Sequence, residues 1–218
     1  MYAREVNGKV LSFGHAGILY RNSFVMYDRE TESLWVHVTG RAESGARKGW
    51  QLRFMPSSMT SWAAWKAAHP NTTVLPGYRR GGFMGTYTGL HSAQGIGLVV
   101  RVAFEAKLYP FEKLAERSVV NDRFRDEDLV VVYSKSAKTA SAWRRTLDGR
   151  VLSFEPHTDD TGKADFLVKD VETGSLWSGL RGEAVAGPMK GRRLTIMPHH
   201  PILTERFAGF YPDGPVMQ

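Results

Sequence analysis

One eight-residue motif occurs twice in this chain, and it constrains the fold more than any other feature. Residues 28–35 read DRETESLW, and residues 170–177 read DVETGSLW, 142 positions later. The similarity continues to a shared Met-Pro pair, so that 14 of the 29 positions aligned from Asp28 onward are identical. A second match, GKVLSF against GRVLSF, precedes the two motifs at a spacing of 141. Chance does not produce such agreement, so the sequence predicts an internal duplication.

The repeated motif has the chemistry of a tight turn that leads into a strand. The aspartate at its first position can accept backbone N–H groups of the turn. The fifth position is expected to need a positive φ angle, which suits Gly174 and strains Glu32. Trp35 and Trp177 follow on the return strand and are expected to anchor the core. We therefore interpret both copies as structural hairpins.

Apolar runs between turn residues predict a β-rich α+β fold, internally duplicated, with two related halves of short antiparallel strands and one short helix in each half. The runs interpreted as strands of the first half are VLSF, ILYRNSFVMYD, SLWVHVTG and WQLRFMP. We place a first, N-terminally shortened repeat at residues 1–76 and a second, complete repeat at residues 98–218. A glycine-rich connector at 77–97 joins them, and the repeats are expected to form one compact unit.

Aromatic-rich segments predict the helices. In the first half, Ser58 or Thr60 would cap the segment SWAAWKAAH, and a proline would end it. The counterpart in the second half, LTERFAGFY, places two phenylalanines three residues apart on one face. A further helix is predicted at 111–117, directly after a proline.

Composition excludes some functions and disfavours others. The 218 residues contain no cysteine, which excludes disulfides, thiolate metal ligands and cysteine nucleophiles within this chain. The formal net charge of +7 would suit an anionic partner, but the basic residues are scattered and form no long block, so nucleic-acid binding is not expected. The sequence has no apolar run long enough for a transmembrane helix and no export signal in the chain as given. These patterns predict a soluble protein and leave its compartment open.

Candidate ligand-binding residues come from polar positions that the hairpins leave unexplained. His157 lies near Asp159 and Asp160 in a polar loop, and His15 stands near its equivalent in the first repeat. A fold that brings the halves together would allow His15 and His157 to share a metal ion with a carboxylate. Their spacing matches no established metal motif, so we predict ligand binding here rather than a metal site.

Asn121 and Asp122 complete the set of candidate residues. Both residue types favour turns, so we expect them first as turn formers. A second interpretation places them in a polar cluster that lines a cleft between the repeats.

Several further motifs occur together along the chain. They are residues 8–35, TSWAAWKAAHPNTTVL, EAKLYPFEKL, VVND, and DGRVLSF with DVETGSLW. Over nearly the whole chain this combination resembles a large prokaryotic family, domain of unknown function 3179, which has no established activity. The resemblance implies a Cys-Pro-Leu-Cys segment after a tyrosine-ended strand, a pattern suited to thiol redox or metal chemistry. In this chain Ser134 and Ala137 stand at the two cysteine positions.

The sequence supports one main functional hypothesis and two alternatives. We expect a non-catalytic binding or structural domain, with a small ligand or a partner in a groove between the halves. The first alternative is a thiol- or metal-dependent member of an oxidoreductase family whose reactive segment is missing from this chain. The weaker alternative is nucleic-acid binding through the basic surface. If VLSF at 10–13 leaves an unpaired strand edge, homodimerisation is expected to cover it; the cofactor question stays open.

Overall fold

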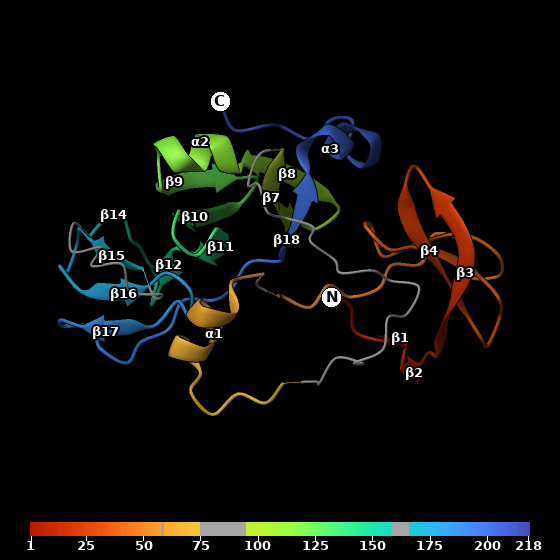
Figure 1. Cartoon of the computed structure of the whole chain (residues 1–218), viewed down its shortest axis with the longest axis horizontal. Helices are drawn as coiled ribbons and strands as arrows, with labels where there is room; N and C mark the ends of the chain where they lie inside the picture. The colour runs from red at the N-terminus through yellow and green to blue at the C-terminus, as the bar shows by residue number, and fades with distance from the viewer. Residues whose placement is uncertain (58, 75–94, 158–165) are drawn as a thin grey trace. The chain divides into compact units, whose positions relative to one another are not determined.

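The computed structural model describes residues 1–57, 59–74, 95–157 and 166–218. Within these ranges the chain forms several small antiparallel sheets and three short helices, which confirms the predicted β-rich fold (Figure 1). The helices are α1 (Trp62–Ala68), α2 (Phe111–Glu116) and α3 (Thr204–Phe210). None of the helices in these ranges is long and apolar enough to cross a membrane.

The chain divides into two compact units by its internal contacts. The first consists of Met1–Ser57 with Arg206–Asp213, and the second of Ser58–Glu205 with Gly214–Gln218. The predicted repeats, at residues 1–76 and 98–218, come from the alignment of the sequence with itself. Their borders are a different quantity from the limits of these units and remain a prediction.

A four-stranded antiparallel sheet in the order β3-β4-β5-β6 forms the body of the first unit. Its strands are β3 (Phe13–Tyr20), β4 (Ser23–Asp28), β5 (Leu34–Val36) and β6 (Arg41–Ser44). A short hairpin of β1 (Glu5–Val6) and β2 (Lys9–Val10) precedes the sheet. The buried side chains that pack together in this unit are Val6, Leu11, Trp35, Ala42 and Leu52.

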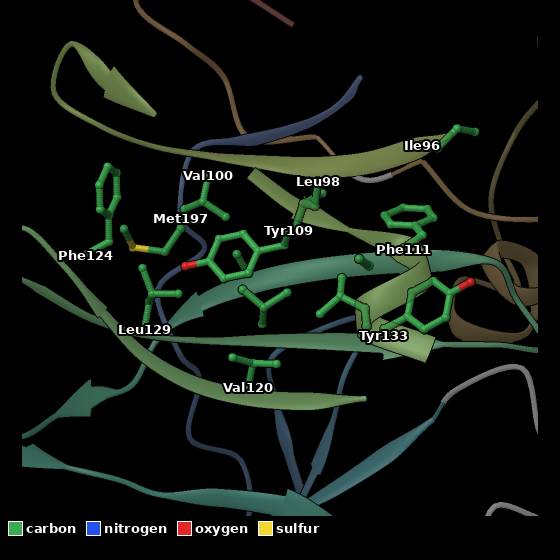
Figure 2. Packing of buried hydrophobic residues seen from close by; sticks show 14 residues of the cluster. Ile96, Leu98, Val100, Tyr109, Phe111, Val120, Phe124, Leu129, Tyr133 and Met197 are labelled. Atoms are coloured by element: carbon green, nitrogen blue, oxygen red, sulfur yellow. The ribbon is translucent and has the colours of Figure 1, made fainter. Parts of the chain in front are cut away.

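Two three-stranded sheets, in the orders β18-β7-β8 and β11-β10-β9, share the largest core of the second unit. The strands are β7 (Ile96–Val102), β8 (Glu105–Pro110), β9 (Val119–Phe124), β10 (Glu127–Ser134), β11 (Thr139–Arg144) and β18 (His199–Leu203). Figure 2 shows how Tyr109 reaches into this core above Leu129 and Val120. Helix α2 follows β8 directly, because Pro110 at its N-cap has the fixed φ of −61° that leads into a helix.

A further sheet of the second unit has the same strand pattern as the sheet of the first. Its order is β14-β15-β16-β17, and a short hairpin of β12 and β13 precedes it. The strands are β12 (Thr146–Leu147), β13 (Arg150–Val151), β14 (Phe154–Pro156), β15 (Leu167–Asp170), β16 (Leu176–Ser178) and β17 (Ala184–Ala186). Both four-stranded sheets change register at the same place, immediately before Trp35 and before Trp177. The six strands β1–β6 and the six strands β12–β17 therefore give the two copies of the motif the same local geometry.

The short hairpins that precede these sheets turn through equivalent residues. Asn7 and Gly8 have φ angles of 51° and 75°, and Asp148 and Gly149 have 51° and 76°. Two successive positive φ angles define the type I′ turn, for which Asn-Gly and Asp-Gly are the preferred sequences. Two residues in each hairpin thus specify the same type of turn in both halves.

Three details differ from the sequence prediction. Helix α1 is capped by Ser61, which accepts the N–H of Ala64 at 3.2 Å, and not by Ser58 or Thr60. Residues 50–56 were predicted as a strand but make only isolated β-bridges. The connector predicted at 77–97 lies outside the described residues up to position 94, and its last two residues already belong to β7.

The predicted strand edge is present in part. Val10 pairs with Glu5 in the β1–β2 hairpin, whereas β3, which begins at Phe13, lies at the edge of its sheet. Homodimerisation through this edge stays a prediction. Light scattering at micromolar concentration is the measurement, and a monomeric mass would count against the dimer.

Candidate functional site

The first corner of the repeated motif holds a buried carboxylate that accepts four bonds from protein groups. Asp28 is fully buried and accepts hydrogen bonds from the Thr31 N–H (2.8 Å) and hydroxyl (2.8 Å). The indole N–H of Trp35 donates to the second oxygen at 2.7 Å, and the Arg47 guanidinium forms a buried ion pair at 2.6 Å. Three of these donors bond to Oδ1 and one to Oδ2, and the side chain has no exposed surface, so the carboxylate is not accessible to a ligand.

The same partners keep Asp28 ionised. Burial alone would raise the pKa of its carboxyl. The hydrogen bonds from Trp35 and Thr31, with the charge of Arg47, outweigh burial and hold the pKa below its usual range. The corner therefore stabilises the fold near neutral pH and loses this contribution only in acid.

The second corner keeps the hydrogen bonds and lacks the ion pair. Asp170 accepts the N–H of Thr173 at 2.6 Å, its hydroxyl at 2.8 Å and the indole N–H of Trp177 at 2.8 Å. Met189 occupies the position that is equivalent to Arg47. Among the described residues no cation pairs with Asp170.

The backbone and the indoles of the corners are as predicted. Glu32 has a φ of 56° and Gly174 a φ of 70°, so both copies place their fifth residue in the left-handed region. Trp35 and Trp177 have no exposed surface, and each packs edge-on against a phenylalanine with ring centroids 5.7 and 5.9 Å apart. The corners thus serve the architecture of the sheets.

Asn121 and Asp122 lie inside β9, which corrects their interpretation as turn formers. The side-chain amide of Asn121 exchanges two hydrogen bonds with the backbone of Phe154, at 2.7 and 2.8 Å. The carboxylate of Asp122 accepts the Lys107 ammonium and the Tyr109 hydroxyl, both at 2.7 Å. Sequence favoured a turn because it could not show that these polar groups find partners across neighbouring strands.

The shifted pKa values of this cluster keep Asp122 ionised and Tyr109 protonated near neutral pH. Burial would raise the pKa of Asp122, but the hydrogen bonds from Lys107 and Tyr109 lower it below its usual value. Burial and the neighbouring carboxylate raise the pKa of Tyr109 far above that of an ordinary phenol. These hydrogen bonds therefore connect β8 and β9 without a change of protonation near neutral pH.

The histidine candidates belong to different units. His15 lies on β3 in the first unit, where its Nδ1 accepts the backbone N–H of Gly17 at 2.7 Å. His157 follows β14 in the second unit, and Asp159 and Asp160 lie outside the described residues. In the described ranges no three His, Asp or Glu side chains are grouped so as to hold a metal ion. The shared metal site remains a prediction without support from the described part of the chain.

A cavity of about 300 Å³ in the second unit places His157 beside groups that the sequence did not indicate. We call it the His157 cavity. Its apolar lining includes Val119, Phe166 and Val168, all buried. The polar groups of the lining are Glu116, Ser118, Tyr133, Lys135 and His157. Because Glu116 and Lys135 are exposed, the cavity combines an apolar interior with opposite charges at its rim.

A second cavity, of about 240 Å³, shares the turn between β10 and β11 with the first. The lining of this Thr60 cavity includes the apolar residues Ile96 and Phe111 and the polar residues Thr60 and Ser136. Phe111 lines the Thr60 cavity and Tyr133 lines the His157 cavity, and their rings lie 5.0 Å apart (Figure 2). An aromatic pair therefore stands between the two cavities.

The Thr60 hydroxyl gives the first testable prediction. Its Oγ1 is buried and has no hydrogen-bond partner among the described residues, an arrangement that costs about 1–3 kcal/mol. Thr60→Val keeps the shape and removes the hydroxyl, so it should raise the free energy of unfolding by about 1 kcal/mol in urea denaturation. Ser61→Ala is the matched control and should lower it by about 1 kcal/mol, because Ser61 caps α1. A destabilised Thr60→Val variant would contradict the account of an unpartnered hydroxyl.

The β10–β11 turn contains the two positions where the family resemblance implies cysteines. Ser134 is buried; its Oγ accepts the backbone N–H of Ala137 at 3.1 Å and lies 3.1 Å from the Ser136 Oγ. Lys138 continues the turn with a φ of 48°. Hydroxyl and methyl groups at these two positions build a stable polar turn and supply no thiol.

Sequence reasoning found one residue of the His157 cavity and missed the others. Glu116 ends a helix, and Lys135 stands in a turn, where charged residues are common for reasons of solubility. No pattern in the sequence could separate these two from the other charged surface positions. Only the packing of α2 near the β10–β11 turn brings them to one cavity.

Comparison with known proteins gives one result. A family model described as "Protein of unknown function (DUF3179)" matches residues 1–97 and also residues 90–218. No curated protein and no solved structure matches the chain. The two matched segments together span the whole sequence, which confirms the resemblance inferred from its motifs. The chain therefore belongs to the DUF3179 family, whose description assigns it no function.

Proposed function

We propose that this chain is a non-catalytic binding protein and that the His157 cavity holds its ligand. The observation that carries the proposal is the composition of this cavity, in which buried apolar side chains meet a few polar groups. Cavities of about this size with such a lining are typical of sites for small organic molecules. The polar groups available to orient a ligand are Glu116, Ser118, Tyr133, Lys135 and His157.

The ionisation behaviour of the chain supports binding without catalysis. Catalytic acids and bases commonly have strongly shifted pKa values. Among the described residues, Tyr109 and His199 carry the largest shifts, and neither lines the cavity. Burial raises the pKa of Tyr133, which does line it, so this phenol stays protonated at neutral pH.

The surface charge does not favour the nucleic-acid alternative. Several basic side chains are paired with carboxylates, such as Arg144 with Glu127 at 2.5 Å and Arg193 with Glu183 at 3.0 Å. Paired cations contribute less to phosphate binding than a continuous basic surface would. The oxidoreductase alternative lacks a thiol within these 218 residues.

We also infer that the two halves are copies of one unit, with repeats at 1–76 and 98–218. Equal strand order, equal register shifts and the shared Asp–Trp hydrogen bond support this inference. In this interpretation the corners are the structural feature that both repeats share, and the His157 cavity belongs to the second repeat.

Ligand-observed NMR with four small compounds tests the proposed function. The probes are 1-pentanol, hexanoate, pentylamine and L-norleucine, which share a short alkyl chain and differ in charge. Ligands of this size reach dissociation constants of about 1 mM, so saturable binding of at least one probe is expected in that range. Ser118→Phe fills the cavity and should weaken binding at least about tenfold.

Ser136→Phe is the matched control for this experiment. Ser136 is a serine of the β10–β11 turn that lines the Thr60 cavity and not the His157 cavity, so its replacement should leave binding unchanged. The proposal fails if none of the four probes binds, or if Ser118→Phe binds them as well as the unmodified protein does.

A further inference from the structure

We propose that the ligand of the His157 cavity is a zwitterion of the amino-acid type, with its ammonium group at Glu116 and its carboxylate at Lys135. This inference rests on the proposed function. Both residues line the same cavity, one from the end of α2 and the other from the turn that follows β10.

Glu116 and Lys135 are both without an oppositely charged partner in the part of the chain that the structure describes. In particular, these two residues do not pair with each other. Elsewhere in this unit neighbouring opposite charges do meet, as Lys107 and Asp122 do at 2.7 Å. Two opposite charges at one cavity that remain apart leave space for a ligand to bond to both.

Charge balance distinguishes a zwitterion from simpler ligands. An anion would gain from Lys135 but be repelled by Glu116, and a cation would meet the reverse. A molecule that carries both charges avoids either repulsion and adds no net charge to the site.

The rest of the lining suits the remaining parts of such a ligand. Tyr133 and His157 line the same cavity as Lys135, and a phenol hydroxyl and an imidazole N–H are both able to donate a hydrogen bond to a carboxylate. Val119, Phe166 and Val168 are less than one-tenth exposed and offer apolar surface to a side chain. A cavity of about 300 Å³ lies at the small end of ligand sites, which favours a single amino acid over a peptide.

The four probes used above separate the contributions of the two charges. Hexanoate is L-norleucine without the ammonium group, and pentylamine is L-norleucine without the carboxylate. In isothermal titration L-norleucine should bind about fivefold more tightly than either, because each rim contact adds the energy of an exposed ion pair. Equal affinities of L-norleucine and hexanoate, or of L-norleucine and pentylamine, would overturn the inference.

Two neutral variants assign each charge to its residue. Glu116→Gln should reduce the affinity for L-norleucine about fivefold and leave that for hexanoate unreduced. Lys135→Gln should also reduce the affinity for L-norleucine about fivefold, and it should leave the affinity for pentylamine unreduced. Lys138→Gln is the matched control, because Lys138 lines the Thr60 cavity and not the His157 cavity. If either rim variant leaves L-norleucine binding unchanged, the assignment is wrong.

The outcomes distinguish this inference from the proposed function. Binding of 1-pentanol that Ser118→Phe abolishes, without a preference for L-norleucine, would refute the zwitterion and keep the cavity as a binding site. Failure of every probe would refute both.

Discussion

Replacement of Asp28 by alanine is expected to destabilise the first unit by about 3–5 kcal/mol, more than the same change at Asp170 destabilises the second. Both changes leave a buried indole N–H and a threonine without their acceptor, for which we expect a loss of about 2–3 kcal/mol. Only Asp28→Ala also leaves Arg47 buried without its partner, because the second corner has Met189 at that position. Urea denaturation followed by tryptophan fluorescence measures the difference.

Arg47→Met is the control that isolates the ion pair. It places at position 47 the methionine that the second corner has at 189, and Asp28 keeps its hydrogen bonds from Thr31 and Trp35, so the variant should cost less than about 1.5 kcal/mol. In the double variant Asp28→Ala with Arg47→Met, the total loss should fall to that of Asp170→Ala. If Asp28→Ala lowers the free energy of unfolding by no more than Asp170→Ala does, the buried ion pair does not contribute the stability that we assign to it.

Acidification from pH 7 to pH 4 is expected to remove about 3 kcal/mol of stability through His199 alone. This side chain on β18 is fully buried; its Nδ1 donates to the Met197 carbonyl at 2.9 Å, and its Nε2 has no partner among the described residues. Burial lowers the pKa of His199 from 6.5 to about 4. The unfolded chain takes up a proton near pH 6.5 and the folded chain only near pH 4, so stability falls as the pH decreases through this window.

His199→Asn provides the comparison, because asparagine can donate to the same carbonyl and does not titrate. The variant should lose about 3 kcal/mol less than the unmodified chain between pH 7 and pH 4. Burial also lowers the pKa of His37 in the first unit, so His37→Asn measures how much of the slope comes from that residue. A pH slope that His199→Asn leaves unchanged would show that the histidine is not held neutral by burial.

Local chemistry made the repeated corners predictable from the sequence. An aspartate, a residue with positive φ and a tryptophan within eight positions are enough to specify a turn, because their hydrogen bonds are made within the motif. The family could be recognised for the same reason, since its motifs are short and continuous. Glu32 shows how strong the constraint is, because it adopts the left-handed conformation that glycine has in the other copy.

Long-range packing limited what the sequence could indicate about the site. Asn121 resembled a turn residue because its partner, the backbone of Phe154, lies 33 positions away. His157 was recognised as polar and chemically versatile, but Glu116 and Lys135 became candidates only when α2 and the β10–β11 turn were seen at one cavity. The sequence could not predict this cavity, because its lining comes from four separate stretches of the chain.

The proposed binding function requires that the ligand binds in the His157 cavity. The most direct test is an NMR titration of ¹⁵N-labelled protein with whichever of the four probes binds most tightly. We predict saturable shifts of backbone amides at 115–119, 133–135, 157 and 166–168, with none at the Asp28 and Asp170 corners. Shifts centred on either corner, or confined to residues outside these segments, would contradict the account.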